Sequence, residues 1–88
     1  MNIKGISTVE ENLMKSKGDD AVIGISHKLY GKQKIKLKLD YILDSKRIGF
    51  RLKNGQEIFV YKDEIVDCGI EDGIYFADDI MEVKIKTV

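Results

Sequence analysis

Proline and tryptophan are absent from this chain of 88 residues, and cysteine and histidine each occur once. The single cysteine, Cys68, cannot form an internal disulfide, so the chain is expected to fold in a reducing compartment without covalent cross-links. One cysteine and one histidine, His27, do not make the set of four ligands that structural zinc requires. No glycine-rich phosphate loop occurs either. The sequence therefore predicts no metal site and no cofactor.

Long apolar runs and net charge are also missing. No stretch approaches the roughly 18 apolar residues that a membrane-spanning helix requires, and residues 1–12 contain no apolar segment of a secretory signal. The 15 Lys and Arg residues balance 15 Asp and Glu residues. Total charge therefore does not point to nucleic acid or to a membrane. We expect a cytoplasmic protein with no membrane partner.

The balanced charge is unevenly distributed along the chain. Residues 1–62 hold 13 Lys and Arg against 7 Asp and Glu, whereas residues 63–88 hold 2 against 8. The two parts therefore carry about +6 and −6. This polarity favours contacts between oppositely charged surfaces, either with a protein partner or between copies of the chain.

The most informative stretch is Lys34–Lys62, which alternates between apolar and polar residues. Ile35, Leu37, Leu39 and Tyr41 fall on one face of a strand, and Lys34, Lys36, Lys38 and Asp40 fall on the other. A polar break at Asp44–Arg47 interrupts the pattern, which then resumes and closes on Asn54-Gly55. The stretch therefore predicts strands that are buried on one face and joined by tight turns.

Two registers compete for the hairpin that closes on Gly55. A two-residue turn pairs Phe50 with Phe59. A three-residue loop with Gly55 in the left-handed conformation pairs Phe50 with Ile58, Ile48 with Val60 and Arg51 with Glu57. The second register is favoured, because it places apolar pairs on one face and an opposite-charge pair on the other.

Elements on either side of this stretch are shorter. A helix at about 8–17 is predicted, with Ser7 and Glu10, or Thr8 and Glu11, as a capping box and Gly18 as its stop; Ile3–Ile6 is either a short strand or a tail. Further strands are predicted at 21–26, 65–70, 74–76 and 81–86, with a turn at Glu71–Gly73 and a 3₁₀ turn at Asp78-Asp79. Gly24 is predicted to mark a bulge or a close approach of backbone.

We therefore expect a mainly β fold, a small barrel or roll of about five to seven antiparallel strands with a short N-terminal α-helix. Residues 1–88 form one domain, with the helix at about 8–17 and the barrel or roll at about 20–88. The aromatic residues Tyr41, Phe50, Phe59 and Phe76 are predicted to lie in the core. The remaining core is expected to consist of Ile23, Ile25, Ile35, Leu37, Leu39, Ile48, Leu52, Ile58, Val60, Val83 and Ile85.

The segment Phe76–Ile80, followed by an alternating last strand, resembles the end of Sm-like proteins, which belong to the wider group of SH3-like small β-barrels. The segment Asp40–Asp44 (DYILD) is similar to the Asp-x-x-Met-Asn pattern of the first Sm motif. The resemblance covers about the last 55 residues and implies a barrel topology. Sm-like proteins that bind RNA use an Arg-Gly pair where this chain has Ala77 and Asp78, so RNA binding is not implied at those positions.

One candidate binding surface stands out, a basic strand face. Lysines alternate along 34–38, further basic residues precede them, and no acid occurs between Ala21 and Leu39. Such a face, extended by Arg51 and Lys53 on the next strand, can follow a phosphate backbone, with Tyr30 stacking on a base. The competing interpretation is a solvated strand face whose lysines discourage edge association. The candidate nucleic-acid-binding residues are Lys28, Tyr30, Lys32, Lys34, Lys36, Lys38, Arg51 and Lys53.

Two other constellations are weaker. Eight acidic residues near the C-terminus do not match the spacing of an EF-hand loop and are interpreted as a solvated face: Asp63, Glu64, Asp67, Glu71, Asp72, Asp78, Asp79 and Glu82. A thiol enzyme using Cys68 and His27 is a remote alternative, because it requires the two within hydrogen-bond reach. Cys68 lies within an apolar run, where cysteine acts as a small hydrophobic residue.

The sequence thus predicts a non-enzymatic binding module that acts through protein–protein contacts or self-association. The alternative is binding of RNA or DNA through the lysine-rich strand face. No catalytic residue is predicted.

Overall fold

One α-helix, α1 (Ile6–Lys15), opens the part of the chain that the computed structural model describes, residues 5–88. The helix begins two residues earlier than the sequence suggests, after Gly5 in a left-handed conformation with φ of 97°. No side chain caps its first turn, so the predicted capping boxes of Ser7 and Thr8 are wrong: both residues already lie inside the helix. The expectation for Ile3–Ile6 falls mainly on residues outside the described range.

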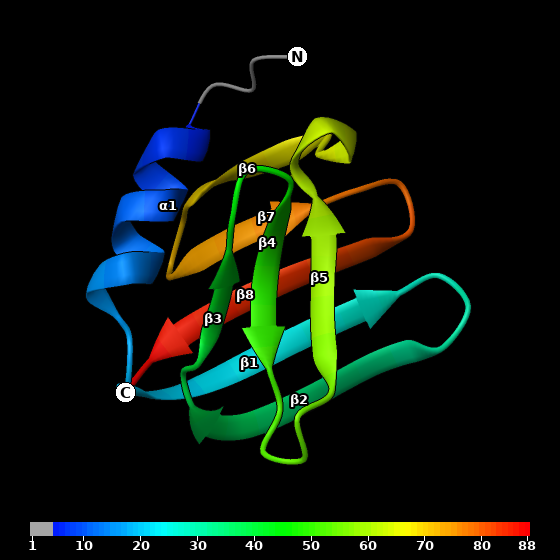
Figure 1. Ribbon diagram of the computed structural model, residues 1–88. Helices are drawn as coiled ribbons and strands as arrows, with labels where there is room; N and C mark the ends of the chain where they lie inside the picture. Colours follow the sequence, from blue (N-terminus) through cyan, green and yellow to red (C-terminus); the bar gives the residue numbers. More distant parts are fainter. Residues whose placement is uncertain (1–4) are drawn as a thin grey trace.

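Helix α1 packs through Val9 and Leu13, which are completely buried. Their spacing of four residues puts them on one face of the helix, as predicted. A helix of ten residues is too short to be stable alone. It lies against the strands β6 (Asp67–Ile70), β7 (Ile74–Ala77) and β3 (Tyr41–Leu43) (Figure 1). Gly18, with φ of 81°, then reverses the chain into the first strand.

Eight strands follow within residues 5–88, and all their pairings are antiparallel. Five form a large sheet in the order β2-β1-β8-β7-β6, and three form a small sheet in the order β3-β4-β5. The strands are β1 (Asp20–His27), β2 (Gly31–Lys38), β3 (Tyr41–Leu43), β4 (Arg47–Arg51), β5 (Glu57–Tyr61), β6 (Asp67–Ile70), β7 (Ile74–Ala77) and β8 (Met81–Thr87). The predicted mainly β fold with a short N-terminal helix is confirmed.

The run Lys34–Leu43 contributes to both sheets instead of forming one strand. Strand β2 ends at Lys38 and β3 begins at Tyr41. At the junction, Leu39 is buried and donates its amide to the carbonyl of Asp19 at 2.9 Å, while Asp40 accepts the amide of Arg51 at 2.8 Å. The junction therefore carries the chain from the large sheet to the small one.

The hairpin of β4 and β5 has the favoured register. Phe50 pairs with Ile58, Ile48 with Val60 and Arg51 with Glu57. Gly55 has φ of 87°, as the three-residue loop requires. This prediction succeeded because a local turn determines the register.

The core lies between the two sheets and the helix (Figure 1). Ten of the residues predicted from alternation are buried, and Ile35, Leu52 and Ile58 are partly buried against them. The prediction that Phe59 lies in the core is wrong. It pairs with Gly49, one position away from the inward pair of Phe50 and Ile58, so it lies on the outer face of the small sheet.

Of the two turns predicted near the C-terminus, one is confirmed and the other has a different form. Gly73 has φ of 116° between β6 and β7, in agreement with the predicted turn. Asp78 does not start a 3₁₀ turn as predicted. Its carboxylate accepts the amides of Ile80 and Met81 at 2.9 and 2.7 Å, and this local bonding forms the turn into β8. A 3₁₀ turn, η1, instead occupies Lys62–Glu64.

Candidate nucleic-acid interface

The outer face of the large sheet carries lysines from two strands. Alternation along β2 places Lys32, Lys34, Lys36 and Lys38 on this face, because the intervening Ile35 and Leu37 point into the core. Alternation along β8 adds Lys84 and Lys86 between the buried Val83 and Ile85. We name the surface formed by Lys32, Lys34, Lys36, Lys38, Lys84 and Lys86 the lysine face.

Strand β1 brings the two sets of lysines together. Its residue Gly24 pairs with Lys34 on one side and Lys84 on the other, and Val22 pairs likewise with Lys36 and Lys86. Adjacent strands lie about 4.8 Å apart, so each lysine pair is separated by roughly 10 Å of backbone. Lys84 and Lys86 were not predicted, since their position depends on pairing between β1 and β8, which are far apart in sequence.

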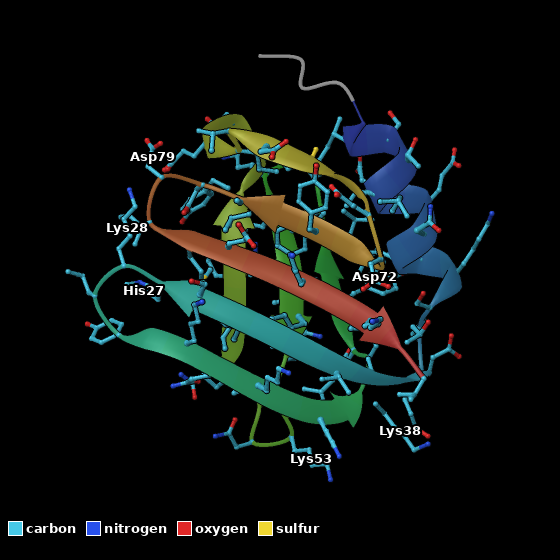
Figure 2. All side chains as sticks on the ribbon, turned by 180° about the vertical axis from the view of Figure 1, so that it is seen from behind. His27, Lys28, Lys38, Lys53, Asp72 and Asp79 are labelled. Atoms are coloured by element: carbon cyan, nitrogen blue, oxygen red, sulfur yellow. The ribbon has the colours of Figure 1, made fainter. Side chains whose placement is uncertain are left out.

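Within the described part of the chain, no other element covers this face. Figure 2 views the molecule from behind and shows β2, β1 and β8 in front, with side chains projecting toward the viewer. The helix and the small sheet lie toward the other side (Figure 1). The face is therefore open to a large ligand.

Ion pairs on the lysine face are few and exposed. Lys38 lies 3.4 Å from Asp20, and Lys86 lies 3.0 Å from Asp72. Lys84 is 4.0 Å from Glu82, at the limit of an ion pair. Lys32, Lys34 and Lys36 form no ion pair with any residue in 5–88. Exposed pairs are weak, so most of these ammonium groups can bind an anion at little cost.

A shallow depression lies in the middle of the lysine face, over Gly24. It has a volume of about 500 Å³ and is lined by Gly24, Ile25, Ser26, Lys32, Gln33, Lys34, Glu82 and Lys84. The prediction that Gly24 marks a bulge or a close approach of backbone is wrong. Both of its ladders are regular, and a Cβ added there would have nothing within 4 Å.

The structure separates the two candidates that were expected to extend the face. Lys53 lies in the β4–β5 loop and lines a second depression with Lys36 and Lys38, next to the end of β2 (Figure 2). Arg51 instead lies on β4 of the small sheet, with its guanidinium 3.3 Å from Asp40 and 3.1 Å from Glu57. The expectation that Arg51 extends the lysine face is wrong.

Lys28 and Tyr30 lie in the turn between β1 and β2. Figure 2 shows Lys28 at one end of the face. The Nδ1 atom of His27 accepts the amides of Leu29 and Tyr30 at 3.0 and 3.3 Å, so His27 shapes this turn. Its ring lies 4.6 Å from that of Tyr30. Tyr30 remains 79% exposed, and its ring is available for stacking at the end of the lysine row.

Cys68 and His27 are not brought together. Cys68 points into the core from β6, and burial raises the pKa of its thiol, with a smaller contribution from Asp67. His27 ends β1, which is separated from β6 by β8 and β7. Three strand spacings amount to about 14 Å, well beyond hydrogen-bond reach. The geometry therefore does not support a Cys–His pair.

The acidic residues divide between two places. Asp63, Glu64, Asp78 and Asp79 surround the exposed apolar side chains of Val66 and Ile80, in a depression of about 330 Å³; we name this surface the acidic end. Asp67, Glu71 and Asp72 lie beside Tyr75 on the far side of Lys84. No cluster able to hold a metal ion occurs among residues 5–88.

The outer face of the small sheet carries an aromatic pair that sequence reasoning missed. The guanidinium of Arg47 lies 5.0 Å from the centre of the Phe59 ring, and Phe59 meets Tyr61 edge to face at 5.4 Å. Asp44 accepts the amides of Lys46 and Arg47 and the Arg47 guanidinium, which together lower its pKa to about 2. The arrangement holds Arg47 against the sheet.

No protein-family model matches the chain, and comparison with curated proteins and with solved structures gave no match. The resemblance to Sm-like and SH3-like barrels therefore stays a prediction. Within residues 5–88, no helix has the length and apolar character needed to cross a membrane.

Proposed function

We propose that this protein is a non-enzymatic module that binds single-stranded RNA or DNA on its lysine face. The observation that carries the proposal is the position of Lys84 and Lys86. They lie on β8, a central strand of the large sheet, and face the same side as the four lysines of β2.

The protection of a sheet edge explains only some of the lysines on this face. Strand β2 is an edge strand, and lysines on an edge discourage pairing with other chains. Strand β8 lies between β1 and β7, and Lys84 pairs with both, so Lys84 has no edge to protect; Lys86, two residues along, pairs with β1. Six lysines from β2 and β8 flank β1, and Asp20 and Glu82 are the only acids on the outer face of these three strands, so the face has a local excess of positive charge.

The spacing of the lysines suits an extended polyanion. Alternate residues of a strand are about 6.7 Å apart, so β2 presents a straight row of ammonium groups on flexible stems. Tyr30 lies at one end of the row and offers a ring on which a base can stack. A single strand exposes both its phosphates and its bases to such a surface, whereas a duplex hides its bases.

A binding titration tests the proposal. Labelled RNA and DNA pools are titrated at about 50 and 200 mM salt. If four lysines contact phosphates, affinity for a single strand falls with a slope of about −0.7 per contact, which amounts to roughly 50-fold over this range. The absence of binding at the lower salt concentration would contradict the proposal.

A matched pair of variants separates the lysine face from total charge. One variant carries Lys34→Glu, Lys36→Glu and Lys84→Glu. The control carries the same changes at Lys15, Lys17 and Lys46, which are exposed elsewhere. Both variants lose six units of charge. The first is expected to abolish binding and the second to weaken it modestly through long-range attraction. An equal loss of affinity in the two variants would refute binding by the lysine face in particular.

Self-association is a second candidate function, and the acidic end favours it. Val66 and Ile80 are 56% and 51% exposed and are ringed by carboxylates, a surface complementary to the lysine face of another copy. Light scattering at low and high salt tests this. Oligomers that dissociate as salt increases would support head-to-tail pairing, and a monomer at all salt and protein concentrations would exclude it.

A further inference from the structure

We infer that the depression over Gly24 holds a phosphate of the bound strand, close to the backbone of β1 and between Lys34 and Lys84. The inference rests on the proposed function and specifies where on the lysine face the nucleic acid comes closest to the protein.

The fold does not need glycine at position 24. Gly24 has no left-handed φ, keeps regular ladders to β2 and β8, and would have nothing within 4 Å of an added Cβ. Glycine inside a strand lowers stability, because it increases the entropy of the unfolded chain and contributes no side chain. The empty space therefore has no structural explanation within the described chain.

Two other glycines, Gly49 in β4 and Gly73 in the turn before β7, each have a structural explanation. A Cβ at Gly49 would lie 2.5 Å from the Cα of Phe59, in a close approach of two strands. A Cβ at Gly73 would lie 2.7 Å from the carbonyl oxygen of Ile85, and Gly73 also has φ of 116°. Gly24 shares neither feature, and close approach of a ligand to the backbone is another reason for glycine within a strand.

The side chains that line the depression also suit a phosphate. Lys34 and Lys84 are the direct cross-strand neighbours of Gly24, with Cβ atoms about 5 Å away on either side. Their flexible stems can bring two ammonium groups over the depression. Ser26, two residues along on the same face, adds a hydroxyl donor. Two cations and a neutral donor around an uncovered backbone suit a phosphodiester oxygen.

Acidic residues limit the path of the strand. Glu82 lies at one side of the depression, and Asp67, Glu71 and Asp72 line the neighbouring depression beyond Lys84. These carboxylates repel phosphates, so the nucleic acid cannot continue across β7 and β6. It is therefore confined to β2, β1 and β8, where it follows the lysine row of β2.

The substitution Gly24→Val tests the inference, because it retains every charge and fills the depression. Binding of a labelled single-stranded oligonucleotide of about 12 nucleotides, within the site sizes of single-strand binding folds, is measured by fluorescence anisotropy. We expect the dissociation constant to rise about tenfold or more, since the phosphate loses charge-assisted hydrogen bonds. The thermal midpoint should stay equal or rise, because valine favours a strand. Gly24→Ala should give a smaller effect in the same direction.

Val22→Ile is the matched control. Val22 lies on the same face of the same strand, one row away between Lys36 and Lys86, and this change should alter the affinity less than twofold. If the wild-type protein binds no oligonucleotide, the proposed function fails. If the wild-type protein binds through its lysines and Gly24→Val binds equally well, only the phosphate position fails. An unfolded Gly24→Val variant would show that the fold needs this glycine and would also overturn the inference.

Discussion

Two glycines inside strands should respond in opposite ways to alanine, although both have unremarkable backbone angles. At Gly24, an added Cβ meets nothing within 4 Å. At Gly49, it would lie 2.5 and 2.6 Å from the Cα and Cβ of Phe59. These neighbours belong to the backbone of β5 or are fixed to it, so they cannot rotate away and the two strands must separate.

The size of each effect follows from the structure. Gly24→Ala should stabilise the protein by about 0.5–1 kcal/mol, because alanine restricts the unfolded chain more than glycine does. Gly49→Ala should destabilise it by about 1–3 kcal/mol, the cost of overpacking, with the upper end expected for a clash with backbone. The two variants should therefore differ by at least about 1.5 kcal/mol, or about 6 °C or more in thermal midpoint for a domain of this size.

Urea denaturation followed by circular dichroism measures this difference, with thermal unfolding as a second readout. A common slope against urea for all three proteins would show that the same surface is exposed on unfolding. Gly24→Ala and Gly49→Ala variants of equal stability would refute the reasoning. So would a destabilised Gly24→Ala variant, because the space over Gly24 would then be part of the fold.

Three further predictions concern other sites. Phe50→Ala should lower the free energy of unfolding, measured in urea, by about 3–5 kcal/mol, because Phe50 is fully buried. Phe59→Ala should lower it by about 1 kcal/mol or less, mainly through loss of the contact with Arg47. Similar losses of stability in the two variants would contradict the assignment of Phe59 to the outer face. Asp44 has a folded pKa of about 2, below its ordinary 3.8, so its stabilising effect is present above about pH 3.8 and lost as the pH falls toward 2. The stability difference between wild type and Asp44→Asn should therefore shrink over that interval, and a constant difference would refute the origin of the shift. The buried Cys68 thiol, whose pKa is raised, should react with iodoacetamide at pH 8 much more slowly in the folded protein than in urea; equal rates would revive the thiol enzyme as a hypothesis.

Local patterns in the sequence predicted local structure well. The pairing of Phe50 with Ile58 followed from a short loop and from the partition of apolar and charged residues. The predicted start of the helix was wrong because Ser7 and Thr8 both look like caps when only nearby residues are considered. The actual start after Gly5 depends on residues distant in sequence: a Cβ added at Gly5 would lie 3.4 Å from the carbonyl oxygen of Cys68.

The candidate site was predicted only in part. The lysines of β2 were recognised because they alternate within one strand. Lys84 and Lys86 were missed because the pairing of β8 with β1 joins distant parts of the chain. Arg51 was assigned to the wrong surface because the continuous alternation of Lys34–Leu43 conceals the change of sheet at Leu39 and Asp40.

The most direct test of the lysine face is a map of amide chemical shifts in the ¹⁵N-labelled protein during titration with a single-stranded oligonucleotide. We expect the largest changes at Gly24, Ser26, Lys34 and Lys84, and little change at Phe59 and Tyr61 on the opposite sheet. Changes concentrated on the small sheet, or no changes at low salt, would contradict the account.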